Sequence, residues 1–511
     1  MTIVNPNEHI APFLSQPVGL KVGLNHLGYR NSAELLFTTL LPGLNNVTAR
    51  IRYYSFYCWV LDKFFEIYDS PTVRDYYSFV RYSEYLLALL HTNLEDSGGI
   101  PGIDYALTVM SENPDVVDLS AGSFNADGST RGTYWANKGG VLRQYYGNSL
   151  RDIGIIVPNL KYPELSNISK EGNNITGKEL AECFEHSIGV EASQTFLNCV
   201  KNHSSSKEER KAIRDAFIMK NVLFDKDEKS LLSNLLIQED LPGRSDRCYR
   251  KETIRLFLEY YNDTVEYNYK DEFEFPKYLY QRYLQGERST PCITGWYCYY
   301  LDDIWQFNAS VVLEGILDIL NKDKFCKWVE LDQFTSELSE IISERFAAEG
   351  RSLEYILADL PEIYGKDNCA RICKAIHSVL QHYKTNKGLW PENEVLRKLF
   401  GYYSMDDFHS ISLFIEKYFN KDFKLFVKYL LESKIIYRHY NVSLRKFYQT
   451  GIASHKFMLE GGFIRYLRDT VAIATHTSPR LNSLKNFLSD LGMISQNGLT
   501  SYGLEVYSSL S

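Results

Sequence analysis

Residues 487–510 read FLSDLGMISQNGLTSYGLEVYSSL and predict a short helix followed by a β-hairpin. The helix is indicated by apolar residues three and four positions apart, which define one face: Leu481, Leu484, Phe487, Leu488 and Leu491. Gly492 follows this run, at the position where a helix C-cap favours positive φ. The next residues predict a strand in MIS, a turn in QNG and a returning strand in LTSYG.

The segment before this helix is interpreted as a second helix and a turn. GFIRYLRDTVAIA, residues 462–474, has the spacing of an amphipathic helix. THTSPRL then predicts a turn in which Thr477 or Ser478 caps the next helix and Pro479 occupies its first turn. Helix, turn, helix, glycine and hairpin is the order of a winged helix-turn-helix. Residues 462–511 resemble that superfamily, in which LGMI followed by LTSYG is a frequent passage from recognition helix to wing.

The same pattern occurs a second time in the chain. SLRDIGIIVPN at 149–159 shares with FLSDLGMISQN the order leucine, any residue, aspartate, apolar residue, glycine and two apolar residues. NITGKELAECF at 174–184 matches GLTSYGLEVY, so an apolar residue and a threonine open the next element in each copy. A fainter third version, YLLESKIIYRHY at 429–440, has the apolar pair without the glycine. The sequence therefore predicts a mainly α, multi-domain protein with two winged-helix modules.

The resemblance implies a place for nucleic-acid contact in each module. In DNA-binding winged helices the exposed face of the second helix meets base edges and the wing meets phosphate. The candidate residues are Arg480, Asn482, Lys485 and Asn486 in the terminal module, and Arg143, Gln144, Asn148 and Arg151 in the first. Because the terminal helix also carries Asp490 and only two cations, docking of partner proteins is the competing interpretation.

The most basic stretch, residues 424–456, precedes the terminal module. It contains seven lysine and arginine residues against one acid, Glu432, with aromatic residues between them. Cations interleaved with aromatics suit phosphate contact and base stacking. The candidate nucleic-acid contacts in this stretch are Arg438, Arg445, Lys446 and Lys456. The alternative is a solvated helix face whose aromatics turn inward.

The loop STRGTYWANKGGVLRQYYGNSLR, residues 129–151, is a second candidate for phosphate contact. Its cations are Arg131, Lys138, Arg143 and Arg151. The helix that follows the glycines has an N-terminus suited to holding an anion. The loop matches neither a Walker A motif nor a dinucleotide-binding fingerprint. A surface loop that leads into the first module is the competing interpretation.

No motif for catalysis, cofactor binding or metal binding is recognised. Tyr-Leu-Asp-Asp at 300–303 has the letters of a reverse-transcriptase metal motif, but its helical surroundings offer no β-hairpin that aims both carboxylates at a metal pair. Asp303 and Glu314 are instead expected to be partly buried carboxylates that pair with a basic helix. Three ligand-type residues cannot converge on one tetrahedral zinc because they follow one helix face: Cys369, Cys373 and His377.

Composition restricts the class of protein. A chain of 511 residues is too long for a single ordinary hydrophobic core, so about two to four domains are expected. Its 44% apolar and 23% charged residues are typical of a globular protein. Only 15 prolines and long amphipathic runs favour helices, with the abundant Tyr and Phe in the core. A net charge of −8 argues against a protein that coats nucleic acid with its whole surface. No transmembrane run or signal peptide is recognised, and the nine scattered cysteines suit reduced thiols in a cytoplasm.

Changes of pattern divide the chain into four segments. Residues 30–92 predict two or three helices broken at Pro42-Gly43, and the Gly-, Ser- and Asp-rich residues 93–139 are interpreted as loops. The predicted domains are an N-terminal helical domain (1–115), a winged-helix-like module with inserted loops (116–205), a central helical domain (206–400), and a basic helical segment with the terminal module (401–511).

Three hypotheses for function follow. LLPGLNNVTARIRYYSFYCWV, residues 40–60, resembles the start of uncharacterised bacterial proteins from phage-defence gene clusters, which implies a subunit of a multi-protein antiviral system. The first hypothesis is a non-enzymatic adaptor that binds double-stranded DNA and proteins encoded nearby, with binding weakened when Lys485, Arg445 and Lys446 are neutralised. The second is a helical scaffold whose modules dock partner proteins without DNA, and the third is a nuclease-like enzyme with a dispersed site. No cofactor, metal or membrane contact is expected, and a homo-oligomer is an open alternative.

Overall fold

The computed structural model confirms a mainly α fold, with 65% helix and 6% strand. Within the part of the chain it describes, no helix is long and apolar enough to cross a membrane. The described residues are 25–92, 98–157, 163–166, 175–220, 225–238, 249–263, 271–288, 290–321, 328–401, 407–451, 453–467 and 474–510.

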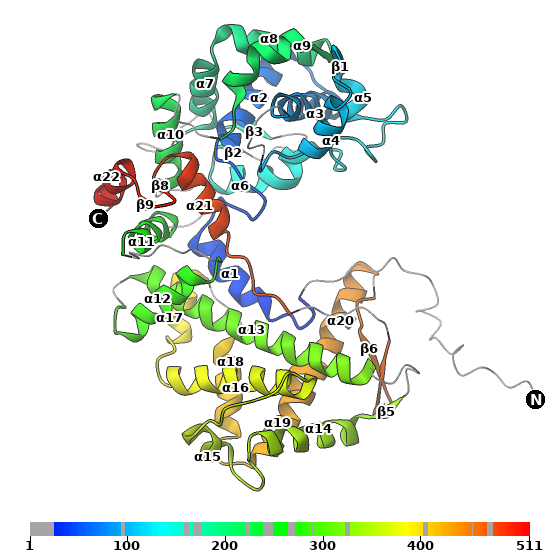
Figure 1. The fold of residues 1–511 in the computed structure, drawn as a ribbon, viewed down its shortest axis with the longest axis vertical. Coiled ribbons are helices and arrows are strands. Elements are labelled where there is room, and N and C mark those ends of the chain that lie inside the picture. The colour runs from blue at the N-terminus through cyan, green and yellow to red at the C-terminus, as the bar shows by residue number, and fades with distance from the viewer. Residues whose placement is uncertain are drawn as a thin grey trace, which may run out of the picture. The chain divides into compact units, whose positions relative to one another are not determined.

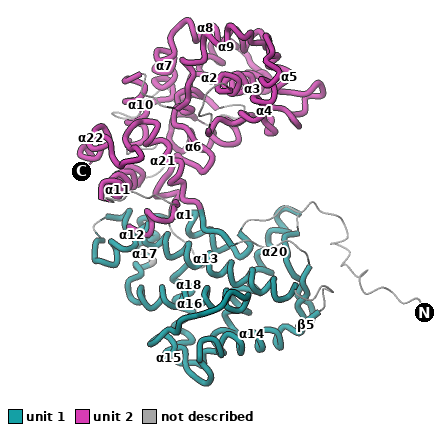
Figure 2. The backbone as a smooth tube through the Cα atoms, in the orientation of Figure 1, with its two compact units in different colours: residues 1–36, 279–477 teal, residues 37–278, 478–511 magenta. Residues whose placement is uncertain are grey.

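The chain forms two compact units, and each is discontinuous in sequence (Figure 2). Unit 1 contains residues 1–36 and 279–477, and unit 2 contains residues 37–278 and 478–511. Of the four segments expected from sequence, 116–205 belongs wholly to unit 2, whereas 1–115, 206–400 and 401–511 each contribute to both units.

Unit 2 is built around α2 (Tyr53–Ile67) (Figure 1). Every residue of α2 from Tyr53 to Leu61 is buried. The prediction of helices in 30–92 is confirmed by α1 (Arg30–Leu40), α2 and α3 (Val73–Leu90). The other helices described in this unit are α4 (Ile103–Met110), α5 (Leu119–Ser123), η2 (Leu142–Tyr146), α6 (Gly147–Asp152), α7 (Gly177–Ile188), α8 (Val190–Lys201), α9 (Lys207–Ile213), η3 (Arg214–Phe217), α10 (Lys226–Ile237), α11 (Arg250–Asp263), α21 (Leu481–Asp490) and α22 (Ser501–Leu510). Residues 93–139 are therefore not only loops, because α4 and α5 lie within them.

The core of unit 2 is rich in aromatic rings, as the composition predicted. Trp59 lies 5.6 Å from Phe184 and 5.4 Å from Phe196, measured between ring centroids. Phe196 stacks on Phe217 at 4.4 Å. These contacts join α2, α7, α8 and η3, so the last helix of the first module and the helices after it pack on the same core as α2.

A buried ion pair links α2 to α10 inside unit 2. The guanidinium of Arg52 lies 3.0 Å from the carboxylate of Glu228, and both side chains are more than 90% buried. Arg52 also donates to the carbonyl oxygens of Ala216 and Ile218, and the Ser55 hydroxyl donates to Glu228 at 2.6 Å. Because every partner is supplied by the protein, the desolvated charges are satisfied.

Unit 1 is arranged around the 31-residue helix α13 (Pro291–Asn321), which packs along α16 (Asn368–Asn386) (Figure 1). Helix α12 (Glu274–Leu284) crosses the boundary between the units, as α1 does. The remaining elements described in unit 1 are α14 (Leu331–Arg345), α15 (Leu353–Ala358), α17 (Asn393–Phe400), α18 (Phe408–Lys417), α19 (Phe423–Tyr429), η4 (Leu430–Ile436), α20 (Tyr437–Thr450), β5 (Val329–Glu330), β6 (Phe457–Glu460) and β7 (Phe463–Tyr466).

The helix expected at 462–474 is wrong, because β7 occupies its first part. Strands β6 and β7 pair antiparallel across Gly461 and Gly462, whose φ angles are 56° and 84°. Positive φ at both central residues is what a two-residue hairpin turn requires. Buried residues alternate along the ribbon, with Ile464 and Tyr466 inward and Phe463 outward, so the local period is two rather than 3.6. Residues 468–473 lie outside the described part of the chain.

Candidate nucleic-acid interface

Both predicted modules contain a helix, a glycine in the left-handed region, a two-stranded hairpin and a second helix. In the first, α6 leads through Gly154 (φ 84°) to β2 (Ile156–Val157), which pairs with β3 (Glu164–Leu165), and α7 follows. In the terminal one, α21 leads through Gly492 (φ 67°) to β8 (Ile494–Ser495), which pairs with β9 (Gly498–Leu499), and α22 follows. The predicted glycine turn and QNG hairpin are confirmed, although most of TSYG begins α22 rather than extending the strand.

The two copies also share a hydrogen-bond pattern behind the hairpin. Ser166 donates its backbone N–H to the Ile155 carbonyl at 3.1 Å, and Thr500 donates in the same way to Met493 at 3.0 Å. The Ser166 hydroxyl accepts from the N–H of Gly177 at 2.9 Å, and the Thr500 hydroxyl accepts from Gly503 at 3.0 Å. Ile155 and Met493 occupy matching sequence positions, one after the glycine.

The expected match between Thr176 and Thr500 therefore needs correction. Thr176 does open α7, through a capping box with Glu179. The residue that bonds the hairpin as Thr500 does is Ser166, which lies ten positions earlier in the chain. Thr500 both bonds the hairpin and precedes the next helix. In the first copy Ser166 bonds the hairpin and Thr176 precedes α7, because residues are inserted between Ser166 and Gly177.

In the terminal module, the described residues expected to form the first helix and the helix cap do not form them. Before α21 the chain runs without helix from 474 to 480, and neither Thr477 nor Ser478 caps α21. The third version of the pattern, at 429–440, is wrong as well, because α19, η4 and α20 form one uninterrupted helix there. A π-type turn in η4 places its apolar pairs in the core without ending the helix.

Residues 41–55 bridge the two modules within unit 2. Asn45 donates its side-chain amide to the Ser149 hydroxyl of the first module at 3.1 Å, and its carbonyl accepts from Ser483 of the terminal module at 2.7 Å. The ring of Tyr54 lies 6.1 Å from Tyr146 and 5.6 Å from Phe487. This part of the N-terminal motif therefore has a structural role in joining the repeated modules.

The first module presents a basic face. Residues 128–151 contain four cations and no acid, and the cationic side chains are all exposed: Arg131, Lys138, Arg143 and Arg151. Gln144 and Asn148 are exposed on the same η2–α6 segment. These residues, Arg131, Lys138, Arg143, Gln144, Asn148 and Arg151, are called the η2–α6 face below.

Local contacts orient the side chains of the η2–α6 face. Arg143 donates to the Tyr77 hydroxyl and lies over the Tyr77 ring, 5.6 Å from its centroid. Arg151 donates to the side-chain carbonyl of Asn148 at 2.5 Å. No ion pair within 4.0 Å engages any of its four cations among the described residues. Asp127 lies near enough to interact electrostatically with Lys138, so the face has four cations against this one neighbouring acid and the Asp152 that ends α6.

Two buried charged residues of α3, Arg81 and Glu84, hold the backbone beneath this face. Arg81 donates to the carbonyl oxygens of Ser123, Asn137 and Trp135. Sequence reasoning missed both residues, although two charges three positions apart in the apolar run VRYSEYLLALL are a signal of this role.

The side chain of Glu84 itself occupies the N-terminus of the helix after the glycines. Its carboxylate accepts from the backbone N–H of Val141 at 2.9 Å and of Leu142 at 2.7 Å. The hydroxyls of Tyr57 and Tyr134 donate to it too, and burial raises the pKa of Glu84. The N-terminal position considered for a bound anion is thus filled by the protein's own side chain.

The terminal module lacks a comparable face. Arg480 points to the Leu41 carbonyl at 3.4 Å and lies over the Phe37 ring. Lys485 is half-buried, and burial lowers its pKa, while Asn482 and Asn486 are exposed. The carboxylate of Glu272 accepts from the Asn482 backbone N–H at 2.7 Å, which places a negative charge at the start of α21.

Most cations of the basic stretch 424–456 are engaged inside unit 1. Lys428 pairs with Asp332 at 2.6 Å, and Arg438 donates to the Leu27 carbonyl at 2.7 Å. Lys446 donates to the Asn25 carbonyl at 2.8 Å, and Lys456 is only 5% exposed. Of the four candidate contacts from this stretch, only Arg445 is exposed.

Asp490 gives unit 2 a testable pH dependence. It is buried beside Arg50 at 2.9 Å, and burial raises its pKa to about 6, against the opposing effect of Arg50. A carboxyl whose pKa is raised by folding favours the fold most below its unfolded pKa, and this contribution is lost as the pH rises through about 6. We expect the free energy of unfolding of Asp490→Asn, taken relative to that of wild type, to increase by up to about 3 kcal/mol between about pH 4 and pH 7. Urea unfolding of the wild-type protein and of Asp490→Asn at several pH values measures this difference in stability. A difference that does not change with pH would contradict the prediction.

The other sequence candidates have structural roles. Asp302 accepts from the Phe408 backbone N–H at 2.9 Å, and Asp303 is buried against His476 and Thr477 rather than a basic helix. Glu314 does pair with Arg371 of α16, as expected, at 3.0 Å. Among the described residues, no group of three His, Cys, Asp or Glu side chains is placed to hold a metal ion, and this includes the set on α16.

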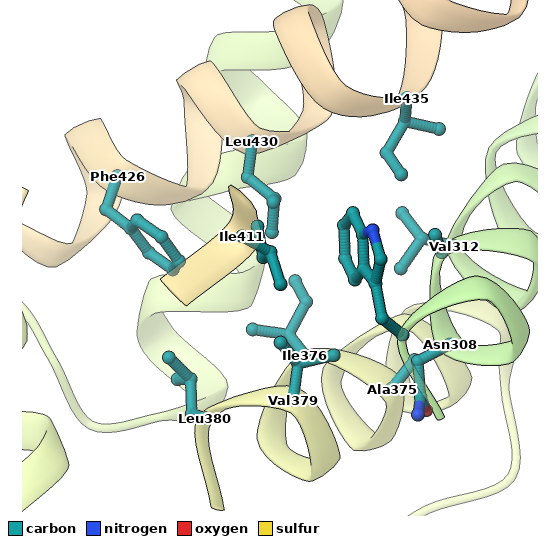
Figure 3. Close-up of a pocket in the computed structure, with 12 residues that line it drawn as sticks. Asn308, Val312, Ala375, Ile376, Val379, Leu380, Ile411, Phe426, Leu430 and Ile435 are labelled. Carbon is teal, nitrogen blue, oxygen red and sulfur yellow. The ribbon is translucent and has the colours of Figure 1, made fainter. Parts of the chain in front are cut away.

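A small cavity in unit 1 lies between α13, α16 and the helix α19–η4 (Figure 3). Its lining is apolar except for Asn308, whose amide donates to the Ile304 carbonyl at 2.8 Å and to Ser378 at 3.3 Å. Because its single polar side chain is already satisfied, the cavity offers no group that would orient a polar ligand.

Comparison with protein-family models, with curated proteins and with solved structures gives no match for this chain. The residues of the η2–α6 face and the chemistry they can perform are therefore the basis for inferring a function.

Proposed function

We propose that this protein is a non-enzymatic DNA-engaging adaptor whose η2–α6 face contacts the phosphate backbone of duplex DNA. The supporting observation is a group of four exposed cations in residues 128–151, a stretch flanked by Asp127 and Asp152 but without an acid of its own, in a chain with a net charge of −8. Phosphate contact by exposed Arg and Lys supplies most of the affinity of non-specific DNA binding. The exposed amides of Gln144 and Asn148 add groups that are able to meet base edges.

The two modules fit this role as reduced winged helices, each with a recognition helix and a wing. In this proposal the first module is the DNA contact, since its helix carries Arg143 and Arg151 on the exposed side. The terminal module has Glu272 at the start of its helix and serves as a docking or structural copy. The N-terminal resemblance to proteins of phage-defence clusters adds the proposal that the adaptor acts within a multi-protein assembly.

Neutralising the η2–α6 face is expected to weaken DNA binding about ten- to hundredfold at low salt, because each exposed charge contact is worth about 0.5–1 kcal/mol. The variant carries Lys138→Gln, Arg143→Gln and Arg151→Gln, and fluorescence anisotropy with a labelled duplex measures the affinity. A matched control removes three exposed cations elsewhere in unit 2: Lys201→Gln, Lys207→Gln and Lys211→Gln.

Equal losses in the two triple variants would show that only net charge matters and would overturn the assignment of this face. Absence of duplex binding by the wild-type chain at micromolar concentration would reject the DNA proposal and favour the scaffold alternative. An equimolar complex with a neighbour-encoded protein that survives high salt would then support that alternative.

A further inference from the structure

Helix α20 belongs to unit 1 (Figure 1). It carries a stripe of exposed side chains that neither the fold nor the η2–α6 face accounts for. Its members follow one another at intervals of four, four and three residues, so they lie on one helix face: Tyr437, Asn441, Arg445 and Tyr448. Tyr437 is 46% exposed and Tyr448 is 78% exposed. Tyr448 is mostly in water and contributes little to the packing of unit 1, and Tyr437 leaves nearly half of its surface open to solvent.

The opposite side of α20 is fixed to the rest of unit 1. Arg438 donates to the Leu27 carbonyl at 2.7 Å, and Lys446 donates to the Asn25 carbonyl at 2.8 Å. His439 is fully buried, and its ring accepts from the Lys456 backbone N–H at 3.1 Å. The exposed stripe is therefore presented on a helix whose orientation within unit 1 is set by contacts on its inner face.

The sequence around the stripe carries charge of one sign. No Asp or Glu occurs between Glu432 and Glu460, a stretch that includes all of α20. Among the described residues, no ion pair or hydrogen bond engages the Arg445 guanidinium. Burial, and then the positive charge of Arg445, lower the pKa of Lys446, as expected where no acid offsets the two cations. In an acidic protein, this is a local region with positive potential.

We infer that the α20 stripe binds single-stranded nucleic acid, with Tyr437 and Tyr448 stacking on bases and Arg445 contacting the phosphates between them. Eleven residues of helix separate the two rings, which is about 16 Å and matches a short run of nucleotides. Single strands are favoured over a duplex because stacking on a side chain requires an exposed base face. Asn441 adds an amide beside the path of the strand.

This site is independent of the proposed duplex contact. It lies in unit 1, uses different residues and takes a different form of nucleic acid. A variant that loses binding to one form of nucleic acid and keeps binding to the other therefore separates the two proposals.

Binding of a dye-labelled oligothymidylate of about 20 nucleotides, measured by fluorescence anisotropy with the full chain, tests the site. Tyr437→Gln with Tyr448→Gln is expected to weaken binding by about tenfold per ring. The matched control replaces two other exposed tyrosines of unit 1, Tyr355→Gln with Tyr364→Gln, and is expected to bind as wild type does.

The conservative pair Tyr437→Phe with Tyr448→Phe keeps the ring faces and is expected to retain wild-type affinity. Arg445→Gln is expected to reduce the salt slope of binding by about 0.7, the value for one phosphate contact on a single strand. The inference is overturned if the wild-type chain does not bind the oligonucleotide at low salt. It is also overturned if the α20 glutamine pair binds like wild type or no worse than the control pair, or if the phenylalanine pair loses as much affinity as the glutamine pair.

Discussion

Alanine at Gly503 is expected to destabilise unit 2 by about 3 kcal/mol, and alanine at Gly177 to do the same in the first module. A Cβ at either position would lie well inside contact distance of a backbone carbonyl, that of Met493 for Gly503 and that of Ile155 for Gly177. A backbone atom cannot rotate away as a flexible side chain can, so the helix after the hairpin must shift. Neither glycine has positive φ, so the cost is steric.

Hydrogen exchange of the full chain in dilute urea measures this effect locally, because it reports opening of residues 142–188 and 478–510 separately from unit 1. The matched controls place alanine at an exposed position in the same helices: Leu504→Ala for α22 and Glu182→Ala for α7. Unchanged protection of both modules in the glycine variants would contradict close packing of this helix on the hairpin in the two copies.

Removing Arg52 alone is expected to cost about 3–5 kcal/mol, because Glu228 would remain buried without its cation. The carbonyls of Ala216 and Ile218 would also lose their donor. Replacing both partners with methionine, as Arg52→Met with Glu228→Met, is expected to recover most of this loss, since two apolar side chains leave no buried charge.

Urea unfolding followed by hydrogen exchange in α2 and α10 compares the single and double variants. The exposed pair of Arg214 and Asp215 supplies the control, and Arg214→Met is expected to cost less than about 1 kcal/mol. If the double variant is as unstable as Arg52→Met, packing rather than charge pairing accounts for the role of Arg52.

Local patterns in the sequence predicted the parts of the fold that depend on local physics. The stripe of Leu481, Leu484 and Phe487 gives a helix, and the positive φ of Gly492 ends it, whatever lies elsewhere in the chain. The strand at 463–466 was missed because four residues cannot distinguish a period of two from 3.6. The decisive signal there is the Gly461-Gly462 turn.

The candidate interface could be predicted only in part, because its electrostatics depend on distant partners. Arg143 and Arg151 were predicted to lie on the exposed face of a helix in the first module, and both side chains are exposed in the structure. Arg480 and Lys446 instead donate to backbone carbonyls of residues more than 400 positions away in the chain. No local pattern shows that an arginine faces inward when its acceptor is a backbone oxygen of another segment.

The salt dependence of duplex binding is the sharpest test of phosphate contact through the η2–α6 face. We expect log K to fall linearly with log salt for the wild-type chain, and the slope to become shallower by about 3 when Lys138, Arg143 and Arg151 are replaced by glutamine. The control triple variant at Lys201, Lys207 and Lys211 is expected to keep the wild-type slope. Equal slopes for all three proteins, or no duplex binding at low salt, would contradict a phosphate contact through the η2–α6 face.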